Sequence, residues 1–424
     1  MDIKNTIHRV KECSFQLASL SEQVRNDALA AVCEGLEKHA DEIFAANSLD
    51  LQRAEAEHLP GPIVSRLKFD RKKMDSCIAG ARDLIDMEDP LFRVLLKRRL
   101  DDGLILTKQT CPIGVIGVIF ESRPDALVQI ACLCIKSGNG IILKGGSEAK
   151  ATNRALFDAI EEAALDAGLP SGFAALLEDR QQIDQLLTCD EDVDLLIPRG
   201  SNAFVQYIMD HSNIPVMGHA DGICHVYVDR DADIEKSIPV IIDSKTQYPA
   251  ACNAAETLLV HRDIAEKLLP DLSGAAGGDI RFLGDPDAVR LIGCDPATPE
   301  DDRKEYLDYI LSVRIVDSAD EAIAHINRFG SHHTDCILTE NDETADRFMA
   351  LVDSAGVYRN CSTRFADGFR YGFGAEVGIS TGKLHARGPV GLDGLVTYKY
   401  RLTGDGHVVA DYASGKSRFH FRDL

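Results

Sequence analysis

The sequence lacks any run of eighteen apolar residues, so it predicts no membrane-spanning helix and no membrane partner. Its first residues, MDIKNTIHRVKEC, lack the apolar core and small-residue cleavage site of a secretory signal, so we expect a cytoplasmic protein. Positive charge is also scarce, because 46 Lys and Arg stand against 68 Asp and Glu, a net charge of −22. This excess argues against a nucleic-acid partner. It still allows an anionic substrate in a locally basic site.

The twelve cysteines do not indicate a disulfide framework. In a long chain without a secretory signal, free thiols in a reducing compartment are the simpler interpretation. Cys132 and Cys134 form a C-x-C pair inside an apolar helical stretch, with no further Cys or His pair nearby. We therefore expect them to pack in a core, and we expect no metal site.

Apolar spacing predicts helices over residues 1–58 and 71–84. After these helices, short apolar runs alternate with helical stretches of 10–20 residues. The runs are expected as strands at 114–120, 140–144, 173–177, 193–197 and 223–228, and then at 257–260, 310–316, 336–338 and 356–358. Such alternation predicts parallel, doubly wound α/β sheets. A chain of 424 residues is too long for one ordinary core, so two or more domains are expected.

Two segments outside this alternation are predicted as β-hairpins. Asp102-Gly103 separates two short runs in 93–112, and Gly404-Asp405-Gly406 supplies a turn within 394–411. Exposed strands of this kind often pair with another subunit, so we expect an oligomer. The acidic stretch 295–302 is expected to be a solvated loop.

No GxGxxG motif follows the first expected strand, so the usual dinucleotide fingerprint is missing. Ser122, Ser147 and Ser201 nevertheless each lie between a strand and a helix, where backbone N–H groups can meet a phosphate. The segment 144–148 (KGGSE) adds a cation and two glycines, and 198–201 (PRGS) has a similar composition. Ordinary helix capping explains the same residues, and both interpretations stay open.

Cys252 differs from the other cysteines because it follows Pro249 and precedes the polar Asn253 at the start of an apolar run. A loop nucleophile would be exposed at such a place, although a packing role stays open. The stretch 358–389 is rich in glycine, arginine, lysine and histidine without an apolar period. It predicts either an ordered loop for an anionic ligand or an exposed basic surface loop.

At these residues the sequence resembles the γ-glutamyl phosphate reductase family of the aldehyde dehydrogenase superfamily. The resemblance runs from about residue 10 to residue 411. The matching segments are PIGVIGVIFESRPDALVQIA (112–131), ILKGGSEA (142–149), LIPRGS (196–201), SKTQYPAACNAAETLLVH (244–261), EYLDYIL (305–311), DEAIAHINRFGSHHTDCILTEN (320–341) and VYRNCSTRFADG with GFGAEVGISTGKLHARGPVGL (357–392). The tail from residue 414 to 424 extends beyond the family's usual end.

The resemblance implies an aldehyde dehydrogenase-like α/β fold with two doubly wound, Rossmann-like domains and a small β-hairpin unit for oligomerisation. The NADPH-binding domain is then expected at 1–92 and 113–230, and the catalytic domain at 231–392. The oligomerisation hairpins and tail are expected at 93–112 and 393–424. A homo-oligomer, either a dimer or a tetramer, follows from this assignment.

The implied activity is NADPH-dependent reduction of L-glutamyl 5-phosphate to L-glutamate 5-semialdehyde with release of phosphate, the second step of proline biosynthesis from glutamate. Cys252 matches the family's catalytic cysteine and would carry the thioester. A transient contact with glutamate 5-kinase is a further hypothesis, because the acyl phosphate is labile. The alternatives are a hydrolytic, NAD-dependent aldehyde dehydrogenase and an inactive scaffold. Hydrolytic enzymes carry a water-activating Glu that is missing from the corresponding segment 219–224, HADGIC.

The resemblance also assigns candidate site residues. The cofactor-binding candidates are Lys144, Ser147, Glu148, Arg199, Gly200 and Ser201. The oxyanion or phosphate candidates are Ser122, Arg123 and Asn253, and the substrate-binding candidates are Asn360, Thr363, Arg364, His385 and Arg387. For His385 and Arg387, contact with phosphate and structural loop closure are the two roles considered. Lys245 and Glu256 either orient the nucleophile or cap local structure. No residue separates NADPH from NADH, although Lys144 could meet a 2′-phosphate.

Overall fold

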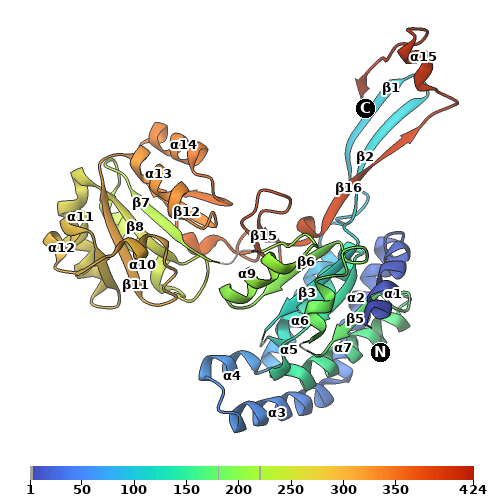
Figure 1. Ribbon diagram of the computed structural model, residues 1–424, viewed down its shortest axis with the longest axis horizontal. Helices are drawn as coiled ribbons and strands as arrows, with labels where there is room; N and C mark the ends of the chain where they lie inside the picture. Colours follow the sequence, from blue (N-terminus) through green and yellow to red (C-terminus); the bar gives the residue numbers. More distant parts are fainter. Residues whose placement is uncertain (1–2, 122, 180, 219–220) are drawn as a thin grey trace.

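The computed structural model describes residues 3–121, 123–179, 181–218 and 221–424. Ser122, an oxyanion or phosphate candidate, lies outside the described residues, as do the first two positions of the segment 219–224. The described chain forms two α/β units and a long arm that projects from the first unit (Figure 1). Two parallel, helix-covered sheets were predicted from the alternation of strands and helices, and that prediction is confirmed.

The first unit is built on a four-stranded parallel sheet in the order β5-β4-β3-β6. Its strands are β3 (Val115–Phe120), β4 (Gly140–Lys144), β5 (Ala174–Leu177) and β6 (Leu195–Arg199). Its helices are α1 (Ile3–Leu17), α2 (Glu22–Lys38), α3 (Ala40–Ala56), α4 (Gly61–Leu67), α5 (Arg71–Asp86), α6 (Pro124–Ser137), α7 (Lys150–Asp166), α8 (Gln181–Leu186) and α9 (Asn202–His211). The chain leaves β3 toward β4 on one side and later returns to β6 on the other. The carboxyl ends of β3 and β6 therefore form a topological switch point, where such sheets bind ligands.

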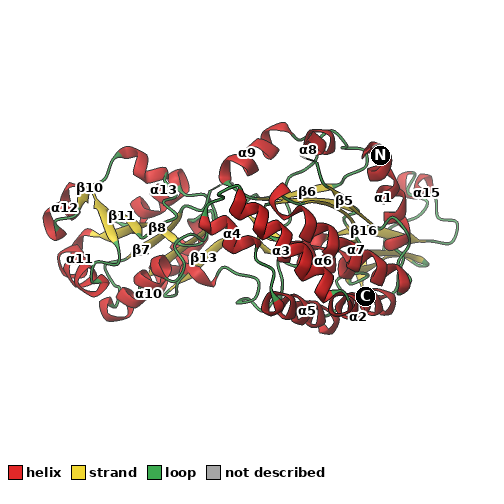
Figure 2. Cartoon of the chain, turned by 90° about the horizontal axis from the view of Figure 1, so that it is seen from below, coloured by secondary structure: helices red, strands yellow, loops and turns green. Residues whose placement is uncertain are grey.

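Both faces of this sheet are buried, which explains why its strands are continuous apolar runs. Ile116 and Val118 of β3 face a core shared with α2, α5, α6 and α7. Val115 and Ile119 face the opposite core, which is completed by α1, α8 and α9. Figure 2 shows α8 and α9 on one side of the sheet and α6 and α7 on the other.

The second unit is built on a seven-stranded parallel sheet in the order β10-β9-β11-β8-β7-β12-β13. Its strands are β7 (Cys224–Val228), β8 (Ala255–His261), β9 (Arg281–Gly284), β10 (Asp295–Pro296), β11 (Ile310–Val316), β12 (Thr334–Leu338) and β13 (Gly356–Arg359). Helices α10 (Ile234–Thr246), α11 (Arg262–Ala276) and α12 (Pro286–Ile292) cover one face. Helices α13 (Ala319–Phe329) and α14 (Asp342–Leu351) cover the other.

One strand lies in a different unit from the one expected. The run 223–228 was assigned with the first sheet, within the expected cofactor domain that ends at residue 230. The structure instead pairs β7 with β8 and β12 near the middle of the second sheet. A strand that is buried on both faces suits either sheet, so its apolar pattern does not indicate which one it joins.

The arm is one four-stranded antiparallel sheet in the order β16-β2-β1-β17. Its strands are β1 (Val94–Asp101), β2 (Leu104–Pro112), β16 (Val396–Thr403) and β17 (Arg422–Asp423). The first predicted hairpin, β1–β2, is confirmed. The second, over 394–411, is wrong, because β16 pairs along the whole of β2 and the residues after its turn form the short helix α15 (Val409–Ala413).

The tail after residue 414 closes the other edge of this arm. β17 pairs with β1, and the Arg98 side chain donates to Asp423 with an Nε to Oδ1 distance of 2.6 Å. His420 Nδ1 lies 2.8 Å from Asp101 Oδ1, and Phe419 stacks on Tyr412. These contacts give the tail a structural role in covering the β1 edge, which would otherwise be open to unwanted pairing.

The remaining short elements lie around the junction of the units. They are the 3₁₀ helices η1 (Ser147–Ala149), η2 (Pro299–Arg303), η3 (Thr363–Phe365) and η4 (Leu392–Leu395), and the strand pair β14 (Gly378–Ser380) and β15 (Gly388–Val390). Side chains between residues 375 and 395 pack in the core of the first unit. Residues 295–300 are largely exposed, as expected of a solvated stretch, but Asp301 and Asp302 are buried and bond to Tyr306 and Arg314.

Candidate active site

The carboxyl edge of the first sheet faces the amino edge of the second. Asn202, at the start of α9 in the first unit, donates its side-chain amide to Glu305 of the second unit at 2.5 Å and to Asp221 at 2.8 Å. Gly222, Cys252 and His333 come just before β7, β8 and β12, which are neighbouring parallel strands. Their amino ends meet at one edge, so the three residues converge although they are far apart in sequence.

The thiol of Cys252 points at a histidine. Cys252 Sγ lies 3.2 Å from His333 Nε2, and the other ring nitrogen of His333 lies 2.9 Å from the Thr334 hydroxyl. His333 is 1% exposed, whereas Cys252 is half-buried. A sulfur within hydrogen-bond reach of a base, which is itself held by a third group, is the arrangement expected of an activated nucleophile.

Backbone packing fixes the position of Cys252. A Cβ placed on Gly222 would lie 2.2, 2.4 and 2.6 Å from the carbonyl oxygen, Cα and carbonyl carbon of Cys252. Only glycine allows this approach. The Cys224 thiol also donates to the Cys252 carbonyl at an S to O distance of 3.3 Å. In the segment 219–224, which lacks the hydrolytic Glu, a glycine therefore lies directly against the backbone of Cys252.

A buried ion pair closes the loop that carries Cys252. Lys245, at the end of α10, and Glu256, in β8, are both fully buried, with Nζ and Oε2 2.6 Å apart. Burial raises the pKa of Glu256 to about 7 and lowers the pKa of Lys245, and each partner opposes the other's shift. The pair brackets residues 246–255, so the Lys245 and Glu256 side chains hold the two ends of the nucleophile loop together.

Two arginines place positive charge near the thiol. Arg199, at the carboxyl end of β6, and Arg364, in η3, both interact electrostatically with Cys252. Burial lowers the pKa of each arginine, and the neighbouring Arg123 and Arg370 add to the respective shifts. Arg364 Nε also donates to Gln247 Oε1 at 2.9 Å, within the nucleophile loop. Positive charge of this kind favours a thiolate.

The cofactor candidates lie along the carboxyl edge of the first sheet. Lys144 ends β4 with its side chain buried, and its Nζ donates to the Gly145 carbonyl at 2.5 Å. Glu148 folds back over Gly146, where a Cβ would lie 2.1 Å from its Oε1. Gly145 and Gly146 line a shallow hollow with Lys150, Asn153, Leu176, Leu177 and Glu178. These residues lie at the carboxyl edge of a doubly wound parallel sheet, which is the edge where such sheets bind dinucleotides.

The start of α9 already holds a carboxylate. Glu121, just after β3, accepts a hydrogen bond from the Ser201 backbone N–H at 3.1 Å. A Cβ on Gly200 would lie 2.7 Å from the same Glu121 oxygen. The Ser201 side chain makes no capping bond within the helix. The backbone donor predicted to meet a pyrophosphate is therefore oriented for an anion, as expected of a helix N-terminus.

The substrate candidates divide into two groups. Thr363 and Arg364 are buried beside the nucleophile loop, where the Thr363 backbone donates to Ser244 Oγ at 3.2 Å and its own hydroxyl has no partner among the described atoms. Asn360 instead exchanges two 2.9 Å hydrogen bonds with the Thr339 backbone and has a φ of 53°. Its side chain therefore holds a local turn together.

Two further candidates close a loop. His385 Nε2 lies 3.2 Å from the carbonyl oxygens of both Asp393 and Val396, and Arg387 donates to Asp353. These contacts correspond to structural loop closure, one of the two roles considered from the sequence.

The side chains of the two described oxyanion or phosphate candidates differ in exposure and in the groups that they already contact. The Asn253 side-chain amide donates to the Ala366 carbonyl at 2.8 Å and is buried. Arg123 is half-exposed and bonds to Asp125 at 3.2 Å, beside the topological switch point. Arg123 is therefore the more available of the two for an incoming anion.

Reasoning from the sequence missed His333 as a functional residue. The segment GSHHTD (330–335) was used only as a family motif, and two adjacent histidines before an apolar strand were the available signal. Sequence spacing does not place His333 beside Cys252, because β7 lies between β8 and β12 in the sheet.

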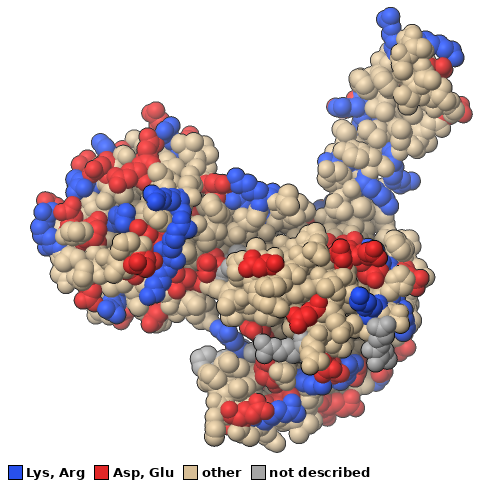
Figure 3. All heavy atoms as spheres, in the orientation of Figure 1, with Lys and Arg blue, Asp and Glu red and all other residues tan. Residues whose placement is uncertain are grey.

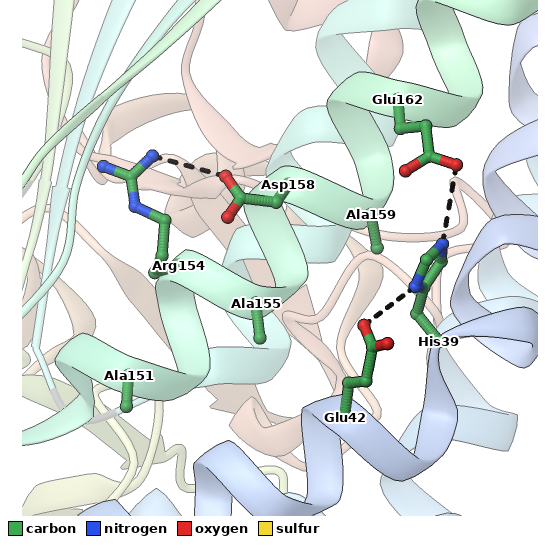
Figure 4. Close-up of a pocket in the computed structure, with 8 residues that line it drawn as sticks. All are labelled: His39, Glu42, Ala151, Arg154, Ala155, Asp158, Ala159 and Glu162. Carbon is green, nitrogen blue, oxygen red and sulfur yellow. Dashed lines mark hydrogen bonds and ion pairs between the residues drawn. The ribbon is translucent and has the colours of Figure 1, made fainter.

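A larger hollow of about 410 Å³ lies away from this site, between α3 and α7. Figure 4 shows His39 there between Glu42 and Glu162, with no nucleophile among the residues that line it. Figure 3 shows acidic and basic side chains interspersed over the two α/β units on the face in view. In the part of the chain that the structure describes, no helix is long and apolar enough to cross a membrane.

A cysteine at the junction of two parallel α/β units is the arrangement expected of oxidoreductases of the aldehyde dehydrogenase type. The profile described as "Aldehyde dehydrogenase family" matches residues 1–288. An acetylating aldehyde dehydrogenase from Geobacillus thermoglucosidasius has the same fold, with a TM-score of 0.65, 16% identity and coverage of 96% of this chain and 97% of its own. The chain belongs to the aldehyde dehydrogenase family, and it is an oxidoreductase with a nicotinamide cofactor.

Comparison with closer relatives narrows the family further. The γ-glutamyl phosphate reductase of Pelotomaculum thermopropionicum is 58% identical over 425 residues, which cover 100% of this chain and 98% of the relative. The crystal structure of the Thermotoga maritima γ-glutamyl phosphate reductase superposes with a TM-score of 0.94 at 38% identity, covering 96% of this chain and 100% of the other. This similarity places the chain in the γ-glutamyl phosphate reductase branch of the aldehyde dehydrogenase family, which confirms the resemblance found in the sequence.

Proposed function

We propose that the protein reduces L-glutamyl 5-phosphate to L-glutamate 5-semialdehyde, with release of phosphate, as the second step of proline biosynthesis from glutamate. One observation carries the proposal: Cys252 Sγ lies 3.2 Å from His333 Nε2, at the amino edge of the second sheet, which faces the carboxyl edge of the first sheet. The relatives named γ-glutamyl phosphate reductase support the choice of substrate.

The chemistry proceeds through the sulfur of Cys252. Its thiolate attacks the acyl carbon, and the phosphate leaves as the C–O bond breaks, which gives a thioester. The bound nicotinamide cofactor supplies hydride for reduction of that thioester. Collapse of the tetrahedral species returns the thiolate and releases the aldehyde. Arg199 and Arg364 stabilise negative charge on the sulfur at the start and the end of this cycle.

The thioester must survive long enough to be reduced, so water must not be activated beside it. Gly222 supports this requirement, because its position against the Cys252 backbone leaves no space for a side chain. Asp221, the one carboxylate of the segment 219–224, accepts a hydrogen bond from Asn202 at 2.8 Å. This arrangement disfavours the hydrolytic aldehyde dehydrogenase alternative.

We assign the charged groups of the substrate as follows. Arg123, beside the switch point, is the candidate for the leaving phosphate, and the Cys252 backbone N–H is the candidate oxyanion donor. Arg364 and the unpartnered Thr363 hydroxyl are the candidates for the α-carboxylate and amino group of the glutamyl end. Asn253, Asn360, His385 and Arg387 support the surrounding loops through the contacts described above.

We assign NADPH as the cofactor, with Lys144 and Glu148 at the adenosine ribose and Ser147 in the same loop. Arg199, Gly200 and Ser201 are assigned to the pyrophosphate side, where the α9 backbone donor is oriented for an anion. We also propose a homo-oligomer, a dimer or tetramer, formed through the arm. Tyr398, Tyr400 and Leu402 on β16 support this assignment, because they are large hydrophobic side chains exposed on an edge strand. A transient contact with glutamate 5-kinase remains a hypothesis.

The test of the proposed function is the reverse reaction. Purified protein is mixed with glutamate semialdehyde and NADP⁺, with and without inorganic phosphate, and reduced cofactor is followed by absorbance. We expect phosphate-dependent oxidation in the wild type and a loss of at least about 10³-fold in Cys252→Ala, because the covalent route is closed. Cys111→Ala is the matched control, since Cys111 is a half-buried cysteine in the arm strand β2, and it should keep full activity.

Two results would contradict the proposal. Oxidation to a carboxylic acid at the same rate without phosphate would favour the hydrolytic alternative. Turnover retained in Cys252→Ala would remove the thioester from the reaction.

A further inference from the structure

We propose that His333 is the proton-transfer residue of the acyl-transfer step, and that it passes the proton of the Cys252 thiol to the departing phosphate. The inference deepens the proposed function and rests on it for the identity of the acyl phosphate. Its structural basis is the 3.2 Å approach of His333 Nε2 to Cys252 Sγ.

The hydrogen bonds of His333 determine which of its ring nitrogens can accept the proton of the Cys252 thiol. Its Nδ1 lies 2.9 Å from Thr334 Oγ1, and Thr334 is buried as the first residue of β12. When Nδ1 carries the hydrogen and donates it to the Thr334 hydroxyl, Nε2 presents its lone pair to the thiol. Because the ring is 1% exposed, packing holds it in this orientation.

The proton balance of the cycle follows from this geometry. His333 Nε2 accepts the Sγ–H proton, and the sulfur forms its bond to the acyl carbon. As the carbon–oxygen bond breaks, the imidazolium gives that proton to the leaving phosphate oxygen. A bound nicotinamide cofactor would then supply hydride to the thioester carbon, and the sulfur would leave as thiolate with its electron pair. One proton from solvent, taken up through His333, then restores the Sγ–H beside a neutral imidazole, so each turnover consumes one proton.

Other charged and titratable groups face the same thiol and must be separated from His333. Arg199 comes from β6, Arg364 from η3 and Cys224 from β7. The Lys245–Glu256 pair lies behind Cys224 and interacts with it. The arginines stay charged throughout the accessible pH range, and burial raises the pKa of Cys224 well above its usual value. Among the described groups, His333 is the neighbour whose ring nitrogen lies within hydrogen-bond distance of Sγ, and imidazole is a side chain that can accept and donate a proton.

The experiment measures how fast iodoacetamide alkylates Cys252 as pH is varied, with the peptide 244–261 followed by mass spectrometry. In His333→Gln we expect alkylation about tenfold slower near pH 7, because the thiolate fraction falls. The difference should vanish at high pH, where an ordinary thiol ionises without help. In the same variant, kcat should fall by about 100-fold, the usual contribution of a general acid–base.

Two further variants separate proton transfer from folding. His332→Asn is the matched control, because its Nδ1 bonds to the Asp353 carbonyl at 2.6 Å and asparagine tolerates its φ of 60°. It should leave alkylation unchanged. Thr334→Val keeps the imidazole and the side-chain volume but removes its hydroxyl partner, so it should give a smaller deficit that also vanishes at high pH.

The outcomes are distinguishable from a failure of the proposed function. Equal alkylation of the wild type and His333→Gln at pH 7 would overturn the role of His333, as would a deficit that persists at high pH with an unchanged unfolding midpoint. A wild type that alkylates as expected but oxidises the aldehyde without phosphate would instead overturn the proposed substrate chemistry.

Discussion

The amino edge of the second sheet and the carboxyl edge of the first face each other, but they hold their functional groups by different means. On the thiol side, Cys252 is surrounded by buried groups: His333 and the Lys245–Glu256 pair, with the Gly222 backbone pressed against it. On the cofactor side, Ser147, Gly200 and Ser201 lie in exposed loops at the starts of helices. Glu121 occupies the N–H donor of Ser201.

The difference reflects what each side must do. A covalent nucleophile has to reach the same carbon in every turnover, which favours positioning by buried, interlocked contacts. A cofactor has to enter and leave, so its loops keep backbone donors whose present partners can be exchanged for phosphate oxygens. Substitutions on the thiol side should therefore cost more than substitutions on the cofactor side.

The largest effect is expected when one half of the buried ion pair is removed. Lys245→Met leaves the Glu256 carboxyl buried without its cation, at a cost of about 3–5 kcal/mol in the free energy of unfolding. The loss should grow with pH. Burial raises the pKa of Glu256 in the wild type to about 7. Above pH 7 this carboxyl is ionised in both the folded and the unfolded state, so it no longer makes the free energy of unfolding depend on pH. In the variant, loss of the Lys245 charge raises the pKa of Glu256 further. Each pH unit above 7 should therefore lower the free energy of unfolding of the variant by about 1.4 kcal/mol more than that of the wild type.

Urea unfolding at pH 7 and pH 8.5 measures this prediction. Lys236→Met is the control on the same helix, because Lys236 forms exposed ion pairs with Asp233 and Glu340 at 3.3 Å. It should change the free energy of unfolding by less than about 1 kcal/mol. A pH-independent loss in Lys245→Met would mean that Glu256 has the same protonation state in the folded variant as in the folded wild type between pH 7 and pH 8.5.

The strands and the fold class were predictable because each depends on a local pattern, and the same kind of pattern made Cys252 the candidate nucleophile. Buried parallel strands are continuous apolar runs, and Cys252 lies in a long family motif. The position of β7 in the second sheet was not predictable, since a run that is buried on both faces fits either sheet. His333 was missed for a related reason: its proximity to Cys252 depends on the order of the strands, which the sequence does not encode locally.

The second prediction concerns the glycine that lies against the nucleophile. Gly222→Ala places a methyl group where the Cys252 backbone now lies, with three of its atoms between 2.2 and 2.6 Å. The loop must move by more than an ångström, and such a displacement of the reacting atom costs about 100-fold in kcat. The measurement is steady-state turnover together with a thermal unfolding midpoint.

Gly218→Ala is the matched control for that change. A Cβ at Gly218 would meet Pro198 at 3.6 Å, which is ordinary van der Waals contact, so turnover should be retained. Turnover close to that of the wild type in Gly222→Ala would show that Cys252 is not held by this contact.

The arm shows the limit of reasoning from turns. The Gly404-Asp405-Gly406 signal did mark a turn, but a turn predicts a hairpin only when the following residues return as a strand. Here β2 already offers its edge to β16, which pairs over the full length from Val396 to Thr403. The chain then continues into α15, and the tail reaches the opposite edge at β1. Strand partners separated by about three hundred residues leave no local signal.

The smallest expected effect tests the exchangeable contacts on the cofactor side. Glu121→Gln removes a negative charge from the start of α9, where Gly200 and Ser201 are proposed to meet the pyrophosphate. The change should strengthen NADPH binding by about 0.3–1 kcal/mol, a few-fold decrease in Kd, because a helix N-terminus favours the anion that remains. Quenching or enhancement of NADPH fluorescence in a titration gives the Kd directly.

Asp233→Asn is the control for this change. Asp233 caps α10 in the second unit by accepting a hydrogen bond from the Lys236 backbone N–H at 3.2 Å, so its substitution should leave the Kd unchanged. Weaker binding in Glu121→Gln would mean that this carboxylate contacts the cofactor, and the cofactor side would then be held as firmly as the thiol side.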